Sequence, residues 1–334
     1  MRDNESETSA TPLTPDTKRS PRASNPRQLL ADIDHRLLAL EEATDLLCET
    51  NYCARATAQD ALEFGVLDAI ARLRRAHDDS HPPDLTLGAG DLQTMEELAE
   101  RAATFGRRLE SIDRGLLKDL RDQIRGGLRG APLRAILDGQ AIGRHHVGHS
   151  PGYDALDGFI ADLILSIPAP TASLDREPEM VFYQPTPVRI ILDLVDRGGF
   201  TRDDLFVDIG SGLGMLPIVV NLLTGTRARG IEIDPSYHRY ATSRATELAL
   251  ADVDFVNADA READYRVGTA FFLYTPFTGQ MLQAVLDRIN LQREGRPVML
   301  FSFGPCTEMV ASQAWLRPAG KINDEHTLAM FRAV

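Results

Sequence analysis

Twelve residues, LFVDIGSGLGML at positions 205–216, decide the fold. The apolar run that begins at Leu205 predicts a short buried strand, and the apolar residues from Leu216 predict a helix. Between them, Gly210, Gly212 and Gly214 predict a tight turn. Because glycine has no Cβ, such a turn lets the backbone approach a ligand closely. The stretch therefore predicts the first strand–loop–helix unit of a ligand-binding sheet.

Alternation of strands and helices continues on both sides of this stretch. It predicts strands at about 205–207, 228–233, 254–257, 270–274 and 298–303, with helices at about 188–195, 216–223, 236–250 and 279–289. Repeated units of this length predict an α/β domain with a mostly parallel sheet covered by helices. Ligands of such sheets bind at the carboxyl ends of the strands. We therefore expect a Rossmann-like domain over residues 180–334.

Acidic residues follow three of these strands. Asp208 precedes the glycines, Glu232 ends the second strand in GIEID (230–234), and Asp259 closes the third in VNADA (256–260). Glu232 lies about 20 residues after the loop, where a carboxylate that binds ribose hydroxyls is expected. Asp259 can accept a hydrogen bond from an adenine amino group. The three carboxylates together predict a nucleoside-binding site.

The glycine spacing distinguishes between nucleoside cofactors. Dinucleotide-binding loops read GxGxxG, whereas this loop reads GxGxG and has Asp208 directly before it. Asp208 would repel a pyrophosphate but can accept hydrogen bonds from an ammonium group. S-adenosylmethionine has an amino-acid end and a sulfonium, and no phosphate. The loop therefore favours S-adenosylmethionine over NAD, and an NAD-dependent oxidoreductase is the weaker interpretation.

A resemblance to a known family rests on these same motifs. VDIGSGLG (207–214), GIEID (230–234) and NADA (257–260) resemble motifs I to III of class I S-adenosylmethionine-dependent methyltransferases. FYQPTP (182–187) is similar to an element of bacterial and mitochondrial protein-lysine methyltransferases and of non-SET histone-lysine methyltransferases. The resemblance covers residues 180–334 and implies a sheet whose last strand is antiparallel. Leu213 and Met215 stand where the lysine-methylating relatives often have Asp and Arg.

The resemblance also implies which residues contact the cofactor. Tyr183 and Thr186 would close over its methionine end, and the loop from Asp208 to Gly214 would bind that end. Glu232 would bind the ribose, and Asp259 with Ala260 the adenine. The implied set is Tyr183, Thr186, Asp208, Gly210, Ser211, Gly212, Gly214, Glu232, Asp259 and Ala260.

The end of the fourth strand is the expected acceptor side. Tyr274-Thr275-Pro276-Phe277 resembles the Asp/Asn-Pro-Pro-Tyr/Phe element of amino-methyltransferases, with Tyr and Thr in its first two positions. Methyl transfer is an in-line displacement, so the main task of the site is to align the acceptor. We expect Tyr274 and Phe277 to line the acceptor pocket. The alternative is that the proline and the aromatic ring pack on the core.

Three histidines occur in GRHHVGHS (143–150). His145 and His149 have the spacing of two metal ligands on a helix, but the flanking glycines favour a loop. We therefore predict no metal site. His146 remains a candidate base or substrate contact.

The residues before 180 have a different texture. Residues 1–26 are rich in Ser, Thr, Pro and charge and predict a disordered tail. Residues 27–150 carry apolar residues at helical spacing and predict an all-helical domain, with helices near 27–47, 54–76, 91–104, 106–126 and 131–141. This domain would act as a substrate lid or form a homodimer. A helix near 153–167 and a linker complete the stretch 151–179.

Bulk composition restricts the function further. The chain has 334 residues and a net charge of −13, which argues against a role in holding long nucleic acids. Its three cysteines, Cys48, Cys53 and Cys306, have no CxxC spacing, which argues against a disulfide framework and a zinc site. No apolar run is long enough for a membrane span. We expect a cytoplasmic protein without a membrane partner.

Taken together, the motifs predict a methyltransferase. We expect it to transfer a methyl group from S-adenosylmethionine to a nitrogen or oxygen of a small molecule, a peptide or a protein. The helical domain would shape the acceptor pocket. Two alternatives stay open: a nucleic-acid methyltransferase, which the TPF element at 275–277 would fit, and a non-catalytic adaptor that keeps the fold.

Overall fold

The computed structural model describes residues 25–78, 87–140, 152–165 and 168–334. These residues form two compact units, one of residues up to 42 with 61–104, and one of residues 43–60 with 105–334. The expected tail lies outside the described residues except for its last two positions, and Pro26 already begins a helix.

The first unit is a small helical bundle. It contains α1 (Pro26–Glu42), the π-helical segment η2 (Ala61–Leu67), α3 (Asp68–Asp78) and the first part of α4 (Ala89–Arg125). Apolar residues at helical spacing form its core: Leu30, Ile33, Leu37, Leu62, Val66, Ile70, Leu73, Met95 and Leu98. On its surface Arg101 reaches Asp34 and Glu41, with N–O distances of 2.7 Å to each.

The second unit begins with helices that were expected to belong to a separate domain. They are η1 (Thr44–Leu47), α2 (Tyr52–Asp60), the rest of α4, α5 (Gly130–Gln140) and α6 (Ala155–Ile164). Arg55 is fully buried among them, and its Nε donates to Asp113 Oδ1 at 2.5 Å. Leu120, Ile124 and Leu133 join the core on one face of the sheet. The boundary between the two units therefore falls within the expected helical domain of residues 27–150, and not at residue 150.

Two expectations about these helices were wrong. The predicted helices 91–104 and 106–126 are one continuous α4, because Phe105 and Leu109 are both buried at helical spacing and a single Gly106 does not interrupt the helix. Leu46 and Leu47 do not extend α1, which ends at Glu42; they form the separate 3-10 turn η1.

Seven strands form one sheet in the order β3-β2-β1-β4-β5-β7-β6. The strands are β1 (Leu205–Ile209), β2 (Arg227–Glu232), β3 (Val253–Asn257), β4 (Ala270–Tyr274), β5 (Met299–Phe303), β6 (Leu316–Pro318) and β7 (Ala329–Ala333). Strands β1 to β5 are parallel, and β7 is antiparallel to both β5 and β6. The expected mostly parallel sheet with an antiparallel last strand is confirmed, and the short β6 at the edge was not expected.

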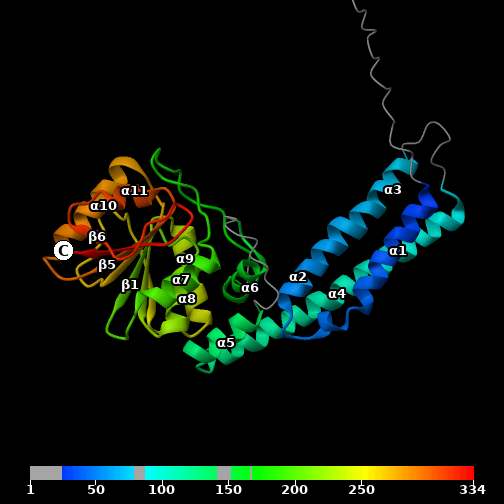
Figure 1. Cartoon of the computed structure of the whole chain (residues 1–334), viewed down its shortest axis with the longest axis horizontal. Coiled ribbons are helices and arrows are strands. Elements are labelled where there is room, and N and C mark those ends of the chain that lie inside the picture. The colour runs from blue at the N-terminus through cyan, green and yellow to red at the C-terminus, as the bar shows by residue number, and fades with distance from the viewer. Residues whose placement is uncertain (1–24, 79–86, 141–151, 166–167) are drawn as a thin grey trace, which may run out of the picture. The chain divides into compact units, whose positions relative to one another are not determined.

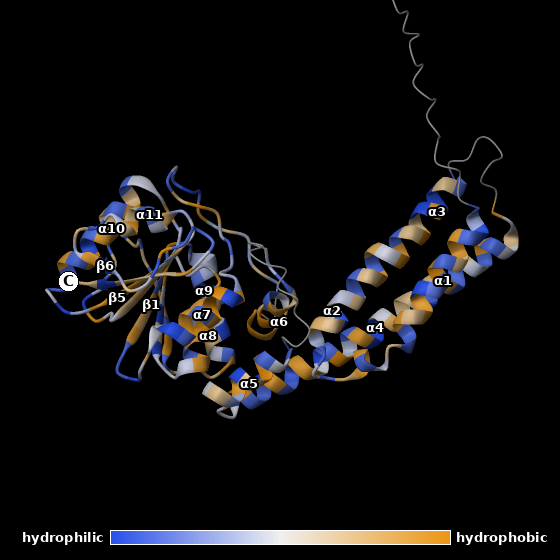
Figure 2. Ribbon diagram, viewed as in Figure 1, coloured by the Kyte–Doolittle hydropathy of each residue, from blue (hydrophilic) through white to orange (hydrophobic). Residues whose placement is uncertain are grey.

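Helices cover both faces of this sheet (Figure 1). Helices α7 (Val188–Gly198), α8 (Met215–Thr224) and α9 (Pro235–Glu247) pack on one face, and α10 (Gly279–Gln292) and α11 (Cys306–Ala311) on the other. Alternate strand residues supply the two cores, with Phe272 on the first face and Phe271 on the second. Helix α8 is buried along its length, and α6 is mostly apolar in Figure 2.

The topology places the ends of four strands together. Strand order reverses between β1 and β4, and the carboxyl ends of β1 to β4 lie at one edge of the sheet. In this arrangement ligands bind at the reversal point. Among the helices that the structure describes, none has both the length and the apolar character needed to cross a membrane.

Candidate functional site

A cleft of about 950 Å³ opens at this edge of the sheet. Its floor is the glycine loop after β1 together with the ends of β2, β3 and β4. Residues 172–186 form the opposite wall, and we call this segment the strap. The sequence-predicted residues Tyr183, Thr186, Asp208, Gly210, Ser211, Gly212, Glu232, Asp259, Ala260, Tyr274 and Phe277 all line this one cleft.

The glycine loop needs glycine for two reasons. Gly210 and Gly212 have φ values of 79° and 53°, which residues with a Cβ rarely adopt. A Cβ at Gly210 would lie 2.5 Å from Pro276, and one at Gly212 would lie 2.3 Å from the Tyr183 ring. The amides of Gly210 and Ser211 donate to the Ile231 carbonyl at 2.9 and 3.0 Å, which holds the loop against β2. The loop is therefore closely covered by the strap and by the end of β4.

Gly214 has a different role from the other two glycines. It is the N-cap of α8, with a φ of 82°, and it does not line the cleft. A Cβ there would lie 2.6 Å from both Ala241 and Phe255. Gly214 thus allows α8 to pack closely against α9 and β3 and makes no contact with the cleft. The contact that the resemblance implied for Gly214 is not present in the lining.

Two buried carboxylates, Asp208 and Glu232, lie at the glycine loop and repel each other electrostatically. Asp208 is 5% exposed, and no described residue donates a hydrogen bond to its side chain. Burial and the negative charge of Glu232 raise the Asp208 pKa well above its ordinary value. Glu232 accepts from the Gly212 amide at 2.7 Å and from the Asp234 amide at 2.8 Å, while burial raises its pKa. A cation that entered this part of the cleft would relieve both charges.

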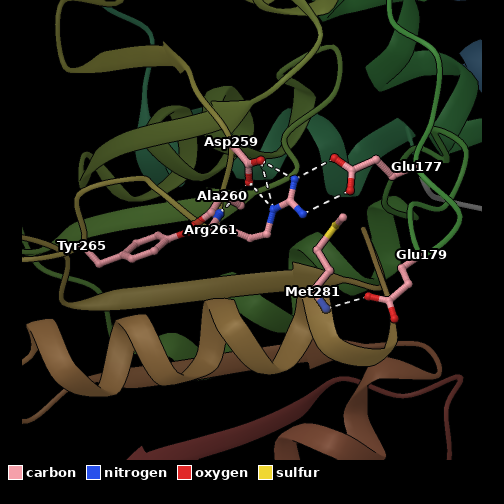
Figure 3. A network of polar contacts seen from close by, with 7 residues as sticks. All are labelled: Glu177, Glu179, Asp259, Ala260, Arg261, Tyr265 and Met281. Atoms are coloured by element: carbon pink, nitrogen blue, oxygen red, sulfur yellow. Dashed lines mark hydrogen bonds and ion pairs between the residues drawn. The ribbon is translucent and has the colours of Figure 1, made fainter.

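Asp259, the carboxylate after β3, already accepts hydrogen bonds from Arg261. Asp259 Oδ1 accepts from the backbone amide of Arg261 at 2.8 Å and from its Nε at 3.0 Å, as Figure 3 shows. Hydrogen bonds from Arg261 lower the Asp259 pKa. The neighbouring Ala260 carbonyl accepts from the Tyr265 hydroxyl at 2.7 Å. The adenine contact that the resemblance implied for Asp259 therefore competes with an existing partner.

The strap is fastened to the ends of successive strands. Near β2, Asp234 Oδ2 accepts from the amides of Ser173 and Leu174 at 2.6 and 2.8 Å. Burial alone would raise the Asp234 pKa, but these hydrogen bonds outweigh it and the pKa is lowered. Near β4, the amide of Val181 donates to the Pro276 carbonyl at 3.0 Å.

Three residues that hold the strap, Glu177, Glu179 and Arg261, were missed by the sequence analysis. Glu179 caps α10, because its two oxygens accept from the amides of Gln280 and Met281 at 3.0 and 2.7 Å. Glu177 pairs with Arg261, with a shortest N–O distance of 2.7 Å. No local pattern marks these residues, since each acts on a partner about 80 or more positions away in the chain.

Aromatic residues line the end of the cleft at which the sequence analysis expected the acceptor. The Tyr274 hydroxyl donates to Gln184 Oε1 at 3.3 Å, and its ring lies 4.7 Å from that of Phe303. Burial raises the Tyr274 pKa, so the phenol stays protonated at neutral pH. Phe277 lines the cleft and also packs in the second core, and its role toward an acceptor stays a prediction. Thr275 between them has a φ of 40°, which is unusual for a β-branched residue.

The histidines at 145, 146 and 149 lie outside the described residues, so the structure does not place His146. In the part of the chain that is described, no group of three or more His, Cys, Asp or Glu side chains could hold a metal ion. The structure instead brings a different histidine, His326, to the rim of the cleft beside Glu325.

Comparisons with known proteins concern less than half of the chain. An RNA methyltransferase from Salinibacter ruber, solved in complex with S-adenosyl-L-homocysteine, is 28% identical over 45% of this chain and 92% of that one, with a TM-score of 0.37. A SAM-dependent methyltransferase from Aquifex aeolicus is 15% identical; the match covers 44% of this chain and 93% of that one, with a TM-score of 0.35. A precorrin-6y C5,15-methyltransferase from Geobacter metallireducens is 16% identical; the match covers 46% of this chain and 93% of that one, with a TM-score of 0.35. No protein-family model and no curated protein matches the sequence.

Proposed function

We propose that this chain is an S-adenosylmethionine-dependent methyltransferase. The observation that carries the proposal is Asp208, a buried carboxylate that lines the cleft and accepts no hydrogen bond from any described residue. Leaving such a charge without a partner is costly, whereas an ammonium group would pair with it. The amino-acid end of S-adenosylmethionine carries an ammonium group of this kind.

The rest of the cleft fits the same ligand. Gly210 and Gly212 offer backbone without side chains for close approach, and Ser211 has a buried hydroxyl that no described residue satisfies. Glu232 ends β2 beside the loop and can accept from ribose hydroxyls with its remaining lone pairs. Phosphate groups suit the cleft poorly because its wall carries Asp208, Glu232 and Asp259. A nucleoside without phosphates therefore fits better than a dinucleotide.

The chemistry of the site follows from its acceptor end. When bound, the cofactor would supply an electrophilic methyl group on a sulfonium. Tyr274, Phe277 and Phe303 then bound the space from which an acceptor must approach. The Tyr274 phenol stays protonated and already donates to Gln184, so its oxygen would orient the acceptor by accepting a hydrogen bond from it, and it would not act as a base. Much of the rate enhancement would come from alignment of the acceptor.

The acceptor proposed here is a small molecule, a peptide or a protein side chain that is methylated on nitrogen or oxygen. The net charge of −13 and the acidic cleft wall disfavour a phosphate backbone. The similarity of residues 182–187 to protein-lysine methyltransferases makes lysine-containing proteins one class to test. The helical stretch 27–150 would select the acceptor or form a homodimer, which stays a prediction.

Calorimetry with S-adenosylhomocysteine tests the binding step on the full-length chain. We expect a dissociation constant of about 1–100 μM, the range typical of enzyme ligands. No binding would support the adaptor alternative. Transfer of a labelled methyl group into a cell extract, separated into small molecules, peptides, proteins and nucleic acids, then identifies the acceptor class. Label in the nucleic-acid fraction alone would favour the nucleic-acid alternative, which the RNA methyltransferase among the similar structures keeps open.

A further inference from the structure

The strap is held across the cleft by one ion pair in addition to backbone contacts. The anchors at Asp234, Glu179 and Pro276 each involve backbone amides. Among the described residues, the pair between Glu177 and Arg261 is the one side-chain ion pair between the strap and the sheet edge. It lies between the other anchors and next to the residues expected at the adenine end of a cofactor.

Arg261 uses its whole guanidinium in this contact (Figure 3). On one side its Nε lies 3.0 Å from each oxygen of Asp259, and its Nη2 lies 2.6 Å from Oδ2. On the other side, Nη2 and Nη1 donate to the two oxygens of Glu177 at 2.7 and 3.1 Å. A planar fork that binds two carboxylates at once has a geometry that lysine cannot reproduce.

We propose that Arg261 is a positioning residue that latches the strap over the bound cofactor and thereby slows cofactor release. The inference rests on the proposed function. Asp259 and Ala260 line the cleft on the sheet side, and the strap lines it on the other side. Arg261 joins the two walls, so opening the strap at this point requires the Glu177 pair to separate.

The latch is suited to control release without being essential for folding. Arg261 is 34% exposed and Glu177 is 47% exposed, and pairs of this exposure contribute little to global stability. The neighbouring anchors at Asp234 and Glu179 stay intact when Arg261 is replaced. Loss of Arg261 should therefore loosen one segment locally and leave the fold unchanged.

The test measures dissociation of S-adenosylhomocysteine from the full-length protein by stopped-flow competition. Arg261→Ala and Glu177→Ala should each raise the dissociation rate about 3- to 10-fold. The double variant should be no faster than either single variant, because both remove the same contact. Arg261→Lys should lie between wild type and Arg261→Ala. In 1 M KCl the wild-type rate should approach that of Arg261→Ala, whose own rate should not respond.

Arg266→Ala is the matched control. Arg266 also pairs with an aspartate two positions before it in the same loop, Asp264, but no described residue of the strap pairs with it. Its removal should leave the dissociation rate unchanged. Additive effects in the double variant, or an equal increase in the control, would overturn the latch.

A second readout needs no ligand. Hydrogen exchange of the Leu174 and Val181 amides, which donate to Asp234 and Pro276, reports strap opening in the free protein. Arg261→Ala should accelerate exchange at both amides, whereas Arg266→Ala should not. If wild type binds no S-adenosylhomocysteine, the proposed function fails, and the exchange experiment still tests the contact. If wild type binds but neither rate changes in Arg261→Ala, the latch alone is refuted.

Discussion

Two aspartates at the same edge of the sheet have pKa values that are shifted in opposite directions. Asp208, near the end of β1, is buried and accepts no hydrogen bond from the residues that the structure describes; burial and the charge of Glu232 raise its pKa. Asp259, after β3, accepts four hydrogen bonds from Arg261, and its pKa is lowered. Within the described part of the chain no cation pairs with Asp208, whereas Arg261 pairs with Asp259. Under the proposed function, Asp208 would recognise the ligand, while Asp259 holds Arg261 at the rim of the cleft.

The strongest test of the Asp208 side changes the glycine loop itself. In Gly212→Val the new side chain would overlap the Tyr183 ring in a backbone conformation that valine rarely adopts. We expect calorimetry to show at least about a 100-fold loss of affinity for S-adenosylhomocysteine. Gly139→Ala, where the added Cβ has no neighbour within 4 Å, is the control and should bind normally. Retained micromolar affinity in Gly212→Val would remove the loop from the binding site.

Asp208→Asn separates binding from stability. Loss of the charge that pairs with the ammonium should weaken binding about 30- to 100-fold. A group whose pKa is raised by folding destabilises the folded state as the pH rises from its unfolded pKa towards its folded pKa, so the free variant should be about 1 kcal/mol more stable than wild type at pH 7.5. Thermal unfolding checks the second effect. A variant that loses both stability and affinity would indicate a structural role for Asp208.

Tyr274→Phe examines the acceptor end of the cleft. The ring contact with Phe303 is kept, but the hydroxyl that donates to Gln184 is lost. Methyl transfer into the labelled acceptor should fall about 10-fold, because one orienting hydrogen bond is removed. The affinity for S-adenosylhomocysteine should stay within about twofold of wild type. An unchanged transfer rate would exclude Tyr274 from the acceptor site.

The raised pKa of Asp208 predicts how binding depends on pH. Protonated Asp208 cannot pair with an ammonium group, and its raised pKa means that it takes up a proton at a higher pH than an ordinary aspartate. Affinity for S-adenosylhomocysteine should therefore rise about fivefold from pH 5 to pH 7.5 in wild type. Asp208→Asn should show a flatter profile over the same range. Affinity that falls with increasing pH would contradict the assigned charge state.

The smallest effect is expected at Asp259. In Asp259→Asn the affinity for S-adenosylhomocysteine should decrease by less than about threefold, because the carboxylate is occupied by a partly exposed partner. A loss as large as that of Asp208→Asn would show that a bound ligand displaces Arg261. The contrast between the two aspartates would then not hold.

Local patterns in the sequence predicted most of the sheet and most of the cleft. Strand β4 was predicted at its observed bounds, and the glycine loop was placed between β1 and α8. These elements depend on short-range causes, namely apolar runs, glycines at positive φ and helix starts. Gly214 was assigned to the ligand with the other glycines, because spacing alone does not tell which glycine faces a cleft and which faces a helix.

Contacts between residues far apart in the chain could not be predicted from local sequence patterns. Nothing near Glu177 in the chain indicates Arg261, and nothing near residues 105–140 indicates that they share a core with α7 and α8. The position of β7 between β5 and β6 depends on which strands pair, and no local pattern in the sequence indicates that. Each of these depends on which surfaces meet after folding.

The sequence by itself determined the class of the sheet, the loop that follows β1 and the three acidic strand ends, because each is encoded within a few consecutive residues. Only the tertiary structure decided which of those acids accepts no hydrogen bond from a described residue and which is paired with arginine. A carboxylate acquires its pKa and its binding capacity from the groups that surround it, and those groups come from segments far apart in the chain.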